Sequence, residues 1–296
     1  MTTTACFTQQ AQSPPPKPAP PPLEFLGEWG TRGEGPGQLS YPSSLAVDFA
    51  GNVYLSDMGN GFVHKFSHDG KPLFSFQDGL VKCPDGLALD GGGAVYVADP
   101  TRGNVVIFFP NGDRLRSLHI APPRKCAEPF GISVDANGNL FVADRGRRVI
   151  QKYSPRWRLL STWGTAKSGP GDVGEPADIA TDAEGFLYVS DTKARLVQKF
   201  SPNGSVVATF SVPATEPAPV VLAGLALSSK HIFVADPAQH RIYVWSKDGS
   251  YLHSENLAAR LHTNEPAPMD VAVTPRGELL VLDSQGARVL RFRINF

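Results

Sequence analysis

The sequence predicts an all-β fold, a six-bladed β-propeller whose ring is closed by an N-terminal strand that completes the last blade. Three observations predict it. A short segment ending in aspartate recurs six times along the 296 residues, each copy divides into four short strands, and the two ends of the chain complement one another.

The repeat is defined by two markers at fixed separation. The first marker ends NVYLSD, AVYVAD, NLFVAD, FLYVSD, HIFVAD and ELLVLD, at Asp57, Asp99, Asp144, Asp191, Asp236 and Asp283. The second marker lies nine residues earlier in five copies and eight in the fifth, at Asp48, Asp90, Asp135, Asp182, Ser228 and Thr274. The first markers are 42 to 47 residues apart, which is the period of a propeller blade and indicates six blades.

Each copy divides into four strands by alternation and turn chemistry. In the third copy, GISVD, NLFVAD, RVIQKYS and LLSTW follow one another with short connections. Turns between third and fourth strands carry Asp69-Gly70, Asn111-Gly112, Asn203-Gly204 and Asp248-Gly249, dipeptides that supply the positive φ of tight hairpins. A four-stranded sheet of this kind cannot bury both faces alone, so radial stacking is expected.

The two ends of the chain predict closure of the ring. The sixth copy stops at Phe296 without a fourth strand, whereas LEFLGEWG at Leu23 to Gly30 has the character of the fourth strand LLSTWG. If this N-terminal segment pairs with the last strand of the sixth copy, no sheet of the ring keeps a long unpaired edge. We therefore divide the chain into a disordered proline-rich tail, residues 1–22, and a six-bladed propeller, residues 23–296.

The markers, the pattern R-V-x-x-F-x-x-x-G and the loop GTRGEGPGQLSYP at Gly30 to Pro42 together resemble the NHL repeat. The resemblance covers Leu23 to Phe296 and implies a ring that binds proteins or RNA, or senses ligands, on its loop face. One similar enzyme branch, the peptidylglycine amidating lyases, uses metal-bound histidines. The seven histidines of this chain fall at unrelated positions of the repeat, which disfavours that branch.

Composition narrows the function classes. Lys and Arg number 28, as do Asp and Glu, so no overall field attracts nucleic acid or an anionic membrane. Cys6, Cys83 and Cys126 are too scattered for a disulfide framework. No stretch of the sequence approaches about 18 apolar residues, the length of a membrane helix. No apolar signal core precedes the spacer SPPPKPAPPP. We therefore expect a soluble protein, and we expect it to be a monomer. With an apolar leader upstream, that spacer would be an export linker.

Basic residues gather in the loops between second and third strands. Arg148, Arg195, Arg241 and Arg288 follow the blade aspartate by four or five residues, and we expect them to pair with that aspartate or with its neighbour. The rest of the set, Arg102, Arg145, Arg147 and Lys193 on blades 2 to 4, predicts a binding patch together with Phe130. Such a patch would suit an acidic peptide, a phosphate or an RNA backbone.

Three carboxylates occupy the inner-strand mouth, where small residues are expected. Alignment of the copies places Asp178 and Asp270 four residues before the second marker, and Asp85 five before it. Oxygen ligands converging near the axis would suit Ca²⁺ or Mg²⁺. The alternative is that these carboxylates accept hydrogen bonds from amides at the starts of adjacent strands.

Three functions follow in order of preference. The first is a non-catalytic scaffold that binds a protein or peptide through its loop face without a cofactor. The second is a metal-dependent lactonase-type or lyase-type enzyme with Asp85, Asp178 and Asp270 as ligands. The third is an RNA-binding module, which the neutral net charge disfavours. No nucleophile elbow and no paired acid and base support catalysis without a metal.

Overall fold

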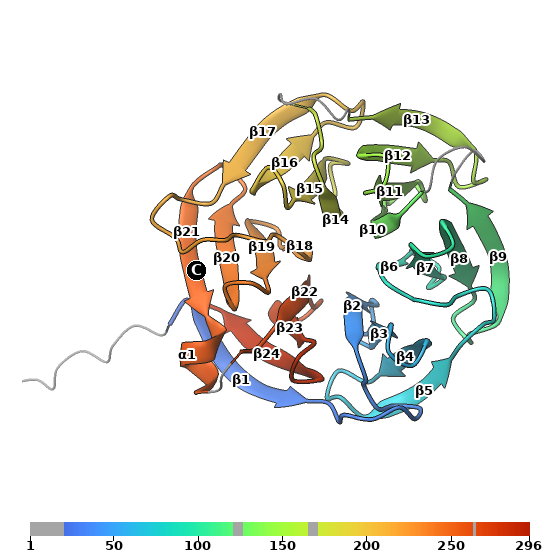
Figure 1. The fold of residues 1–296 in the computed structure, drawn as a ribbon, viewed down its shortest axis with the longest axis horizontal. Coiled ribbons are helices and arrows are strands. Elements are labelled where there is room, and N and C mark those ends of the chain that lie inside the picture. Colours follow the sequence, from blue (N-terminus) through green and yellow to red (C-terminus); the bar gives the residue numbers. More distant parts are fainter. Residues whose placement is uncertain (1–20, 121–126, 165–170, 263–264) are drawn as a thin grey trace, which may run out of the picture.

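The computed structural model describes residues 21–120, 127–164, 171–262 and 265–296. Six antiparallel sheets of four strands each stand around a central axis (Figure 1). The predicted all-β, six-bladed propeller is therefore confirmed. Within the described ranges, no helix is long and apolar enough to span a membrane. Apart from Pro21 and Pro22, the proline-rich tail lies outside these ranges, as do Cys6 and Cys126.

In each blade the strands follow one another from the axis to the outer wall. Blade 1 holds β2 (Pro42–Val47), β3 (Val53–Asp57), β4 (Phe62–Phe66) and β5 (Pro72–Phe76); blade 2 holds β6 (Leu87–Leu89), β7 (Val95–Asp99), β8 (Asn104–Phe108) and β9 (Arg114–His119). Blade 3 holds β10 (Pro129–Val134), β11 (Leu140–Asp144), β12 (Val149–Tyr153) and β13 (Leu159–Trp163); blade 4 holds β14 (Pro176–Thr181), β15 (Leu187–Asp191), β16 (Leu196–Phe200) and β17 (Val206–Ser211).

Blade 5 holds β18 (Leu225–Leu227), β19 (His231–Asp236), β20 (Arg241–Ser246) and β21 (Tyr251–Asn256), followed by the short helix α1 (Leu257–Leu261). Blade 6 holds β22 (Pro268–Val273), β23 (Glu278–Asp283), β24 (Arg288–Ile294) and the N-terminal strand β1 (Leu23–Trp29). Because β1 pairs with β24 from Leu23 opposite Ile294 to Trp29 opposite Val289, the two ends of the chain close the ring as predicted.

The second strands of the blades are the most buried part of the ring, since both of their faces contact neighbouring blades. All five side chains of β3, β7, β11 and β15 are buried. Near-continuous apolar strands of this kind are expected where sheets stack face to face, and they form clusters that span neighbouring blades. In the cluster between blades 6 and 1, for example, Leu280 and Val289 pack with Leu45 and Leu55.

The aspartate that ends each second strand fixes the loops of one face. Asp57 is fully buried and accepts hydrogen bonds from the backbone N–H groups of Ser40 (2.6 Å), Tyr41 (2.9 Å) and Gly59 (2.9 Å). One carboxylate thus joins the loop entering the blade to the loop between its second and third strands. Asp99, Asp144, Asp191, Asp236 and Asp283 are likewise fully buried and accept backbone N–H groups of their loops.

Candidate functional site

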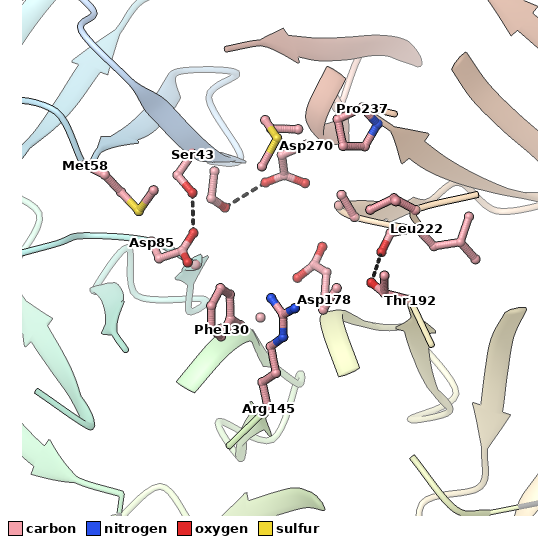
Figure 2. Close-up of a pocket in the computed structure, with 18 of the residues that line it drawn as sticks. Ser43, Met58, Asp85, Phe130, Arg145, Asp178, Thr192, Leu222, Pro237 and Asp270 are labelled. Carbon is pink, nitrogen blue, oxygen red and sulfur yellow. Dashed lines mark hydrogen bonds between the residues drawn. The ribbon is translucent and has the colours of Figure 1, made fainter. Parts of the chain in front are cut away.

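A pocket of about 210 Å³ opens at the axis on the face that these loops form (Figure 2). Its lining contains all three carboxylates identified from the repeat, Asp85, Asp178 and Asp270, and two members of the predicted patch, Phe130 and Arg145. Most of its other lining side chains are small or apolar, and they come from the inner strands and from both kinds of loop: Tyr41, Ser43, Ser44, Met58, Gly86, Gly131, Ala177, Thr192, Val221, Leu222, Ala223, Gly224, Pro237 and Met269.

Arg145 is the one cation among the lining residues, and it lies at the mouth of the pocket beside Phe130 (Figure 2). Its guanidinium lies 5.1 Å from the centroid of the Phe130 ring, a cation–π contact, and 3.3 Å from the Glu175 carboxylate. The side chain of Arg145 is 40% exposed, so the guanidinium can still reach a ligand. The pocket therefore combines an apolar wall with one accessible cation.

The remaining members of the predicted patch do not line the pocket. Arg102 donates to the carbonyl of Gly79 at 2.8 Å. Arg147 turns inward: its side chain is 11% exposed, lies 3.4 Å from the Asp144 carboxylate and donates to the carbonyl of Ile120. Of the set proposed from the sequence, the structure thus brings only Arg145 and Phe130 to the axis.

The predicted pairing of loop arginines with the blade aspartate is confirmed for Arg288 alone, whose Nε donates to Asp283 at 2.8 Å. It is wrong for Arg241, which contacts Glu216 at 3.6 Å and donates to Ser254. It is also wrong for Arg148 and Arg195, which adopt φ of 61° and 56° in the tight turn before the third strand. Within the described ranges the guanidinium groups of these two make no ion pair.

Each of the three carboxylates contacts a neighbouring blade. Asp270 Oδ2 accepts hydrogen bonds from Ser44 Oγ (2.7 Å) and from the backbone N–H of Leu45 (2.8 Å). Asp178 Oδ2 accepts the N–H of Leu225 at 2.8 Å. Asp85 accepts the hydroxyl of Ser43. For Asp178 and Asp270, this is the hydrogen-bonding alternative that the sequence left open, whereas the donor to Asp85 is a hydroxyl and not a strand-start amide.

The carboxylates fit at the axis because the adjacent blades present glycine. A Cβ at Gly224 would lie 2.0 Å from Oδ1 of Asp270, and a Cβ at Gly131 would lie 2.6 Å from Oδ1 of Asp178. Glycine on one inner strand therefore makes room for aspartate on the next. The two aspartates each occupy space that a neighbouring side chain would otherwise fill.

Burial dominates the electrostatics of this site. It raises the pKa of Asp270 to about 7, against partly opposing hydrogen bonds from Leu45 and Ser44. Burial, followed by repulsion from Asp270, raises the pKa of Asp178 well above its ordinary value. Burial also raises the pKa of Asp85, although Ser43 and Arg145 oppose the shift. Burial therefore disfavours the charged form of all three carboxyl groups.

The donor set does not have the arrangement of a metal centre. Across the residues that the structure describes, no group of three or more His, Cys, Asp or Glu side chains is placed to hold a metal ion. Each of the three carboxylates instead uses one oxygen to accept a hydrogen bond from a neighbouring blade.

Several pocket residues escaped the sequence analysis, although the repeat carries a signal for them. Met58, Thr192 and Pro237 each follow a blade aspartate directly, as the predicted Arg145 does, so this position faces the axis in four blades. Thr192 Oγ1 donates to the carbonyl of Leu222 at 2.7 Å, which joins blade 4 to the loop that enters blade 5. Comparison of the residue after each aspartate would have found this group.

No model of a protein family matches the chain, and no curated protein is significantly similar to it in sequence. Solved structures are similar in fold. A streptogramin B lyase is 13% identical, with 85% of this chain and 78% of that chain covered and a TM-score of 0.64. An inactive variant of virginiamycin B lyase from Staphylococcus aureus, with quinupristin, is 13% identical over 90% and 85%, with a TM-score of 0.67.

A chain of a nidogen/laminin complex is 16% identical, with 78% of this chain and 84% of that chain covered and a TM-score of 0.62. At these identities the similarity concerns the fold. The neighbours include lyases and a member of a protein complex, and so they do not single out one activity. The chain is a six-bladed β-propeller.

Proposed function

We propose that this chain is an NHL-type propeller that acts as a non-catalytic scaffold and binds a protein or peptide partner on its loop face. The observation that carries the proposal is the axial pocket, with an apolar wall and the accessible guanidinium of Arg145 at its mouth. A pocket of about 210 Å³ suits one apolar side chain of a partner better than a whole organic substrate, since ligand pockets usually measure roughly 300–1,000 Å³.

The charge at the pocket supports this proposal. Because burial disfavours the charged forms of Asp178 and Asp270, these carboxyl groups oppose an apolar side chain less than exposed carboxylates would. Arg145 would then hold a carboxylate or carbonyl of the partner at the rim. Tyr41, which lines the pocket and is 51% exposed, adds an amphipathic ring of the kind enriched in interfaces.

A selection from a random peptide library, with the purified chain as bait, tests the proposal. Arg145→Glu and Phe130→Ala should each lower the affinity of the chain for the selected peptides by about tenfold or more, as expected for residues at the centre of an interface. Phe49→Ala is the matched control, because Phe49 is 85% exposed in the turn between β2 and β3, away from the pocket lining. If the selected peptides bound both pocket variants with unchanged affinity, the axial pocket would not be the binding surface.

A metal-dependent lactonase-type or lyase-type enzyme is the second candidate, favoured by the presence of Asp85, Asp178 and Asp270 in one pocket. Elemental analysis of the purified chain and thermal melts with and without EDTA test it. Stoichiometric Ca²⁺ or Mg²⁺, together with a melting temperature lowered by EDTA, would support the enzyme. A metal-free chain that is indifferent to EDTA and does not bind added Ca²⁺ or Mg²⁺ would eliminate it. The RNA-binding alternative finds less support, since Arg102 and Arg147 are engaged within the ring.

A further inference from the structure

The turn between the third and fourth strands of blade 3 differs from the same turn in its neighbours. In blades 1, 2, 4 and 5 this turn contains glycine in the left-handed region, with φ of 81°, 89°, 88° and 114° at Gly70, Gly112, Gly204 and Gly249. In blade 3 the equivalent residue is Trp157, which adopts φ of 57° despite its large side chain. A bulky residue in this conformation indicates that its surroundings hold it there.

Contacts with the neighbouring blade hold Trp157. Its side chain packs against the buried apolar cluster between blades 2 and 3, and the guanidinium of Arg116 on β9 lies 4.6 Å from its ring centroid. The indole thus joins the outer parts of two blades. The residues on either side of it, Arg156 and Arg158, are left to face outward.

A surface hollow of about 390 Å³ lies beside this turn, where β13 begins. Its lining is Ser154, Pro155, Arg156, Arg158, Leu159 and Leu160. Leu159 and Leu160 are 52% and 55% exposed on β13, the outermost strand of its blade (Figure 1). The hollow thus places the two charged residues of its lining, Arg156 and Arg158, beside the exposed side chains of Leu159 and Leu160.

The arginines have no internal partner that would account for them. In the described ranges neither guanidinium makes a hydrogen bond or an ion pair, whereas Arg114 on the neighbouring blade lies 3.2 Å from Asp78. The equivalent residues of blade 4, Asn203 and Ser205, serve the turn itself, since the N–H of Ser205 donates to Asn203 Oδ1 at 3.3 Å. Arg156 and Arg158 thus replace turn-forming residues with free cations.

We propose that this hollow, lined by Ser154 to Leu160, is a docking site for an acidic peptide segment of a partner protein. Carboxylates of the segment pair with Arg156 and Arg158, and an aliphatic side chain between them packs on Leu159 and Leu160. Charge complementarity selects an anionic ligand, and the paired leucines select a peptide over an inorganic polyanion. The turn lies at the end of the blade opposite the loop face, so the inference is independent of the axial pocket.

Fluorescence anisotropy with a labelled peptide of alternating Glu and Leu tests the site. A peptide of alternating Lys and Leu tests the need for negative charge, and one of alternating Glu and Ser tests the need for apolar contact. The wild-type chain should bind the Glu/Leu peptide more tightly than either of the other two. The double variant Arg156→Asn, Arg158→Ser installs the residues of blade 4 and should weaken binding by about tenfold, the summed effect of two exposed charge pairs. Its melting temperature should be unchanged, because these residues already form this turn in blade 4.

Arg276→Asn provides the matched control, because Arg276 is an exposed turn arginine of blade 6 outside the hollow. Arg276→Asn should bind the Glu/Leu peptide like wild type, so that a loss of binding in the double variant is assigned to the hollow. Equal binding by the double variant, or no binding of the peptide by wild type, would overturn the proposal. Equally tight competition by inorganic tripolyphosphate would show a general anion site and would also overturn it.

Discussion

The hydroxyl of Ser44 donates a hydrogen bond of 2.7 Å to Oδ2 of Asp270 and so joins the first blade to the sixth beside the axis. Ser44 Oγ also accepts a hydrogen bond from the backbone N–H of Leu87 in the second blade, at 3.2 Å. One small side chain therefore connects three blades. This network explains why a carboxylate can occupy the crowded centre of the ring.

Replacement of Ser44 by alanine should destabilise the ring. The change removes one donor to the buried Asp270 and leaves the N–H of Leu87 without its acceptor, for an expected loss of about 1–3 kcal/mol in the free energy of unfolding. Urea denaturation measures the loss. Ser161→Ala on the outer strand β13 is the control and should change stability by less than about 0.5 kcal/mol, because Ser161 is exposed. Equal effects of the two substitutions would contradict the role of this network.

Stability should depend on pH through Asp270. Its pKa rises from 3.8 to about 7 on folding, so the folded chain retains a proton that the unfolded chain releases. The resulting stabilisation is complete below about pH 4 and is lost as pH rises through about 7. Asp270→Asn removes the titration, so this variant should lose less stability than wild type between pH 5 and pH 8. Denaturation curves at both pH values measure the difference, and parallel losses would contradict the raised pKa.

Gly224 should not tolerate a side chain. A Cβ there would lie 2.0 Å from Oδ1 and 2.4 Å from Cα of Asp270, and so Gly224→Ala should cost about 1–3 kcal/mol through overpacking. Gly91→Ala is the matched control, since nothing lies within 4 Å of its added Cβ and its φ is not positive. Thermal melts compare the two variants. A Gly224→Ala chain as stable as the Gly91→Ala chain would show that the axis has room to relax.

The blade aspartates should contribute to stability through the backbone N–H groups that they accept. Asp57 accepts three backbone N–H groups from two loops, so Asp57→Ala should leave these groups unpaired and cost several kcal/mol, about 1–3 kcal/mol for each buried group that water cannot reach. Hydrogen exchange should show faster exchange at Ser40, Tyr41 and Gly59. Asp69→Ala, in an exposed turn of the same blade, is the control. Unchanged exchange at those three amides would contradict the role of Asp57.

The repeat carries enough information to predict the fold and part of the site. Six copies predict six blades, and the complementary ends predict the pairing of β1 with β24. Alignment of the copies also places Asp85, Asp178 and Asp270 in one pocket, because equivalent positions of a ring converge on its axis.

What the sequence does not predict depends on side-chain directions in loops. Arg145 and Arg147 are two residues apart, yet one reaches the pocket and the other is held by Asp144 inside the ring. Residue type and spacing do not distinguish these outcomes, since both depend on the backbone conformation of the turn. The turn at Trp157 lacks the glycine of the turns at Gly70, Gly112, Gly204 and Gly249, and residue type alone does not predict that Arg156 and Arg158 face outward there.

The axial pocket and both faces exist only if the ring closes through the pairing of β1 with β24, so thermal unfolding of truncated chains tests the account most directly. Removal of residues 1–20 should leave the melting temperature unchanged. Removal of residues 1–30 deletes β1, exposes the edge of β24 and should lower the melting temperature by more than about 10 °C or abolish the cooperative transition. If both truncated chains melted cooperatively at the temperature of the full chain, closure by β1 would be wrong.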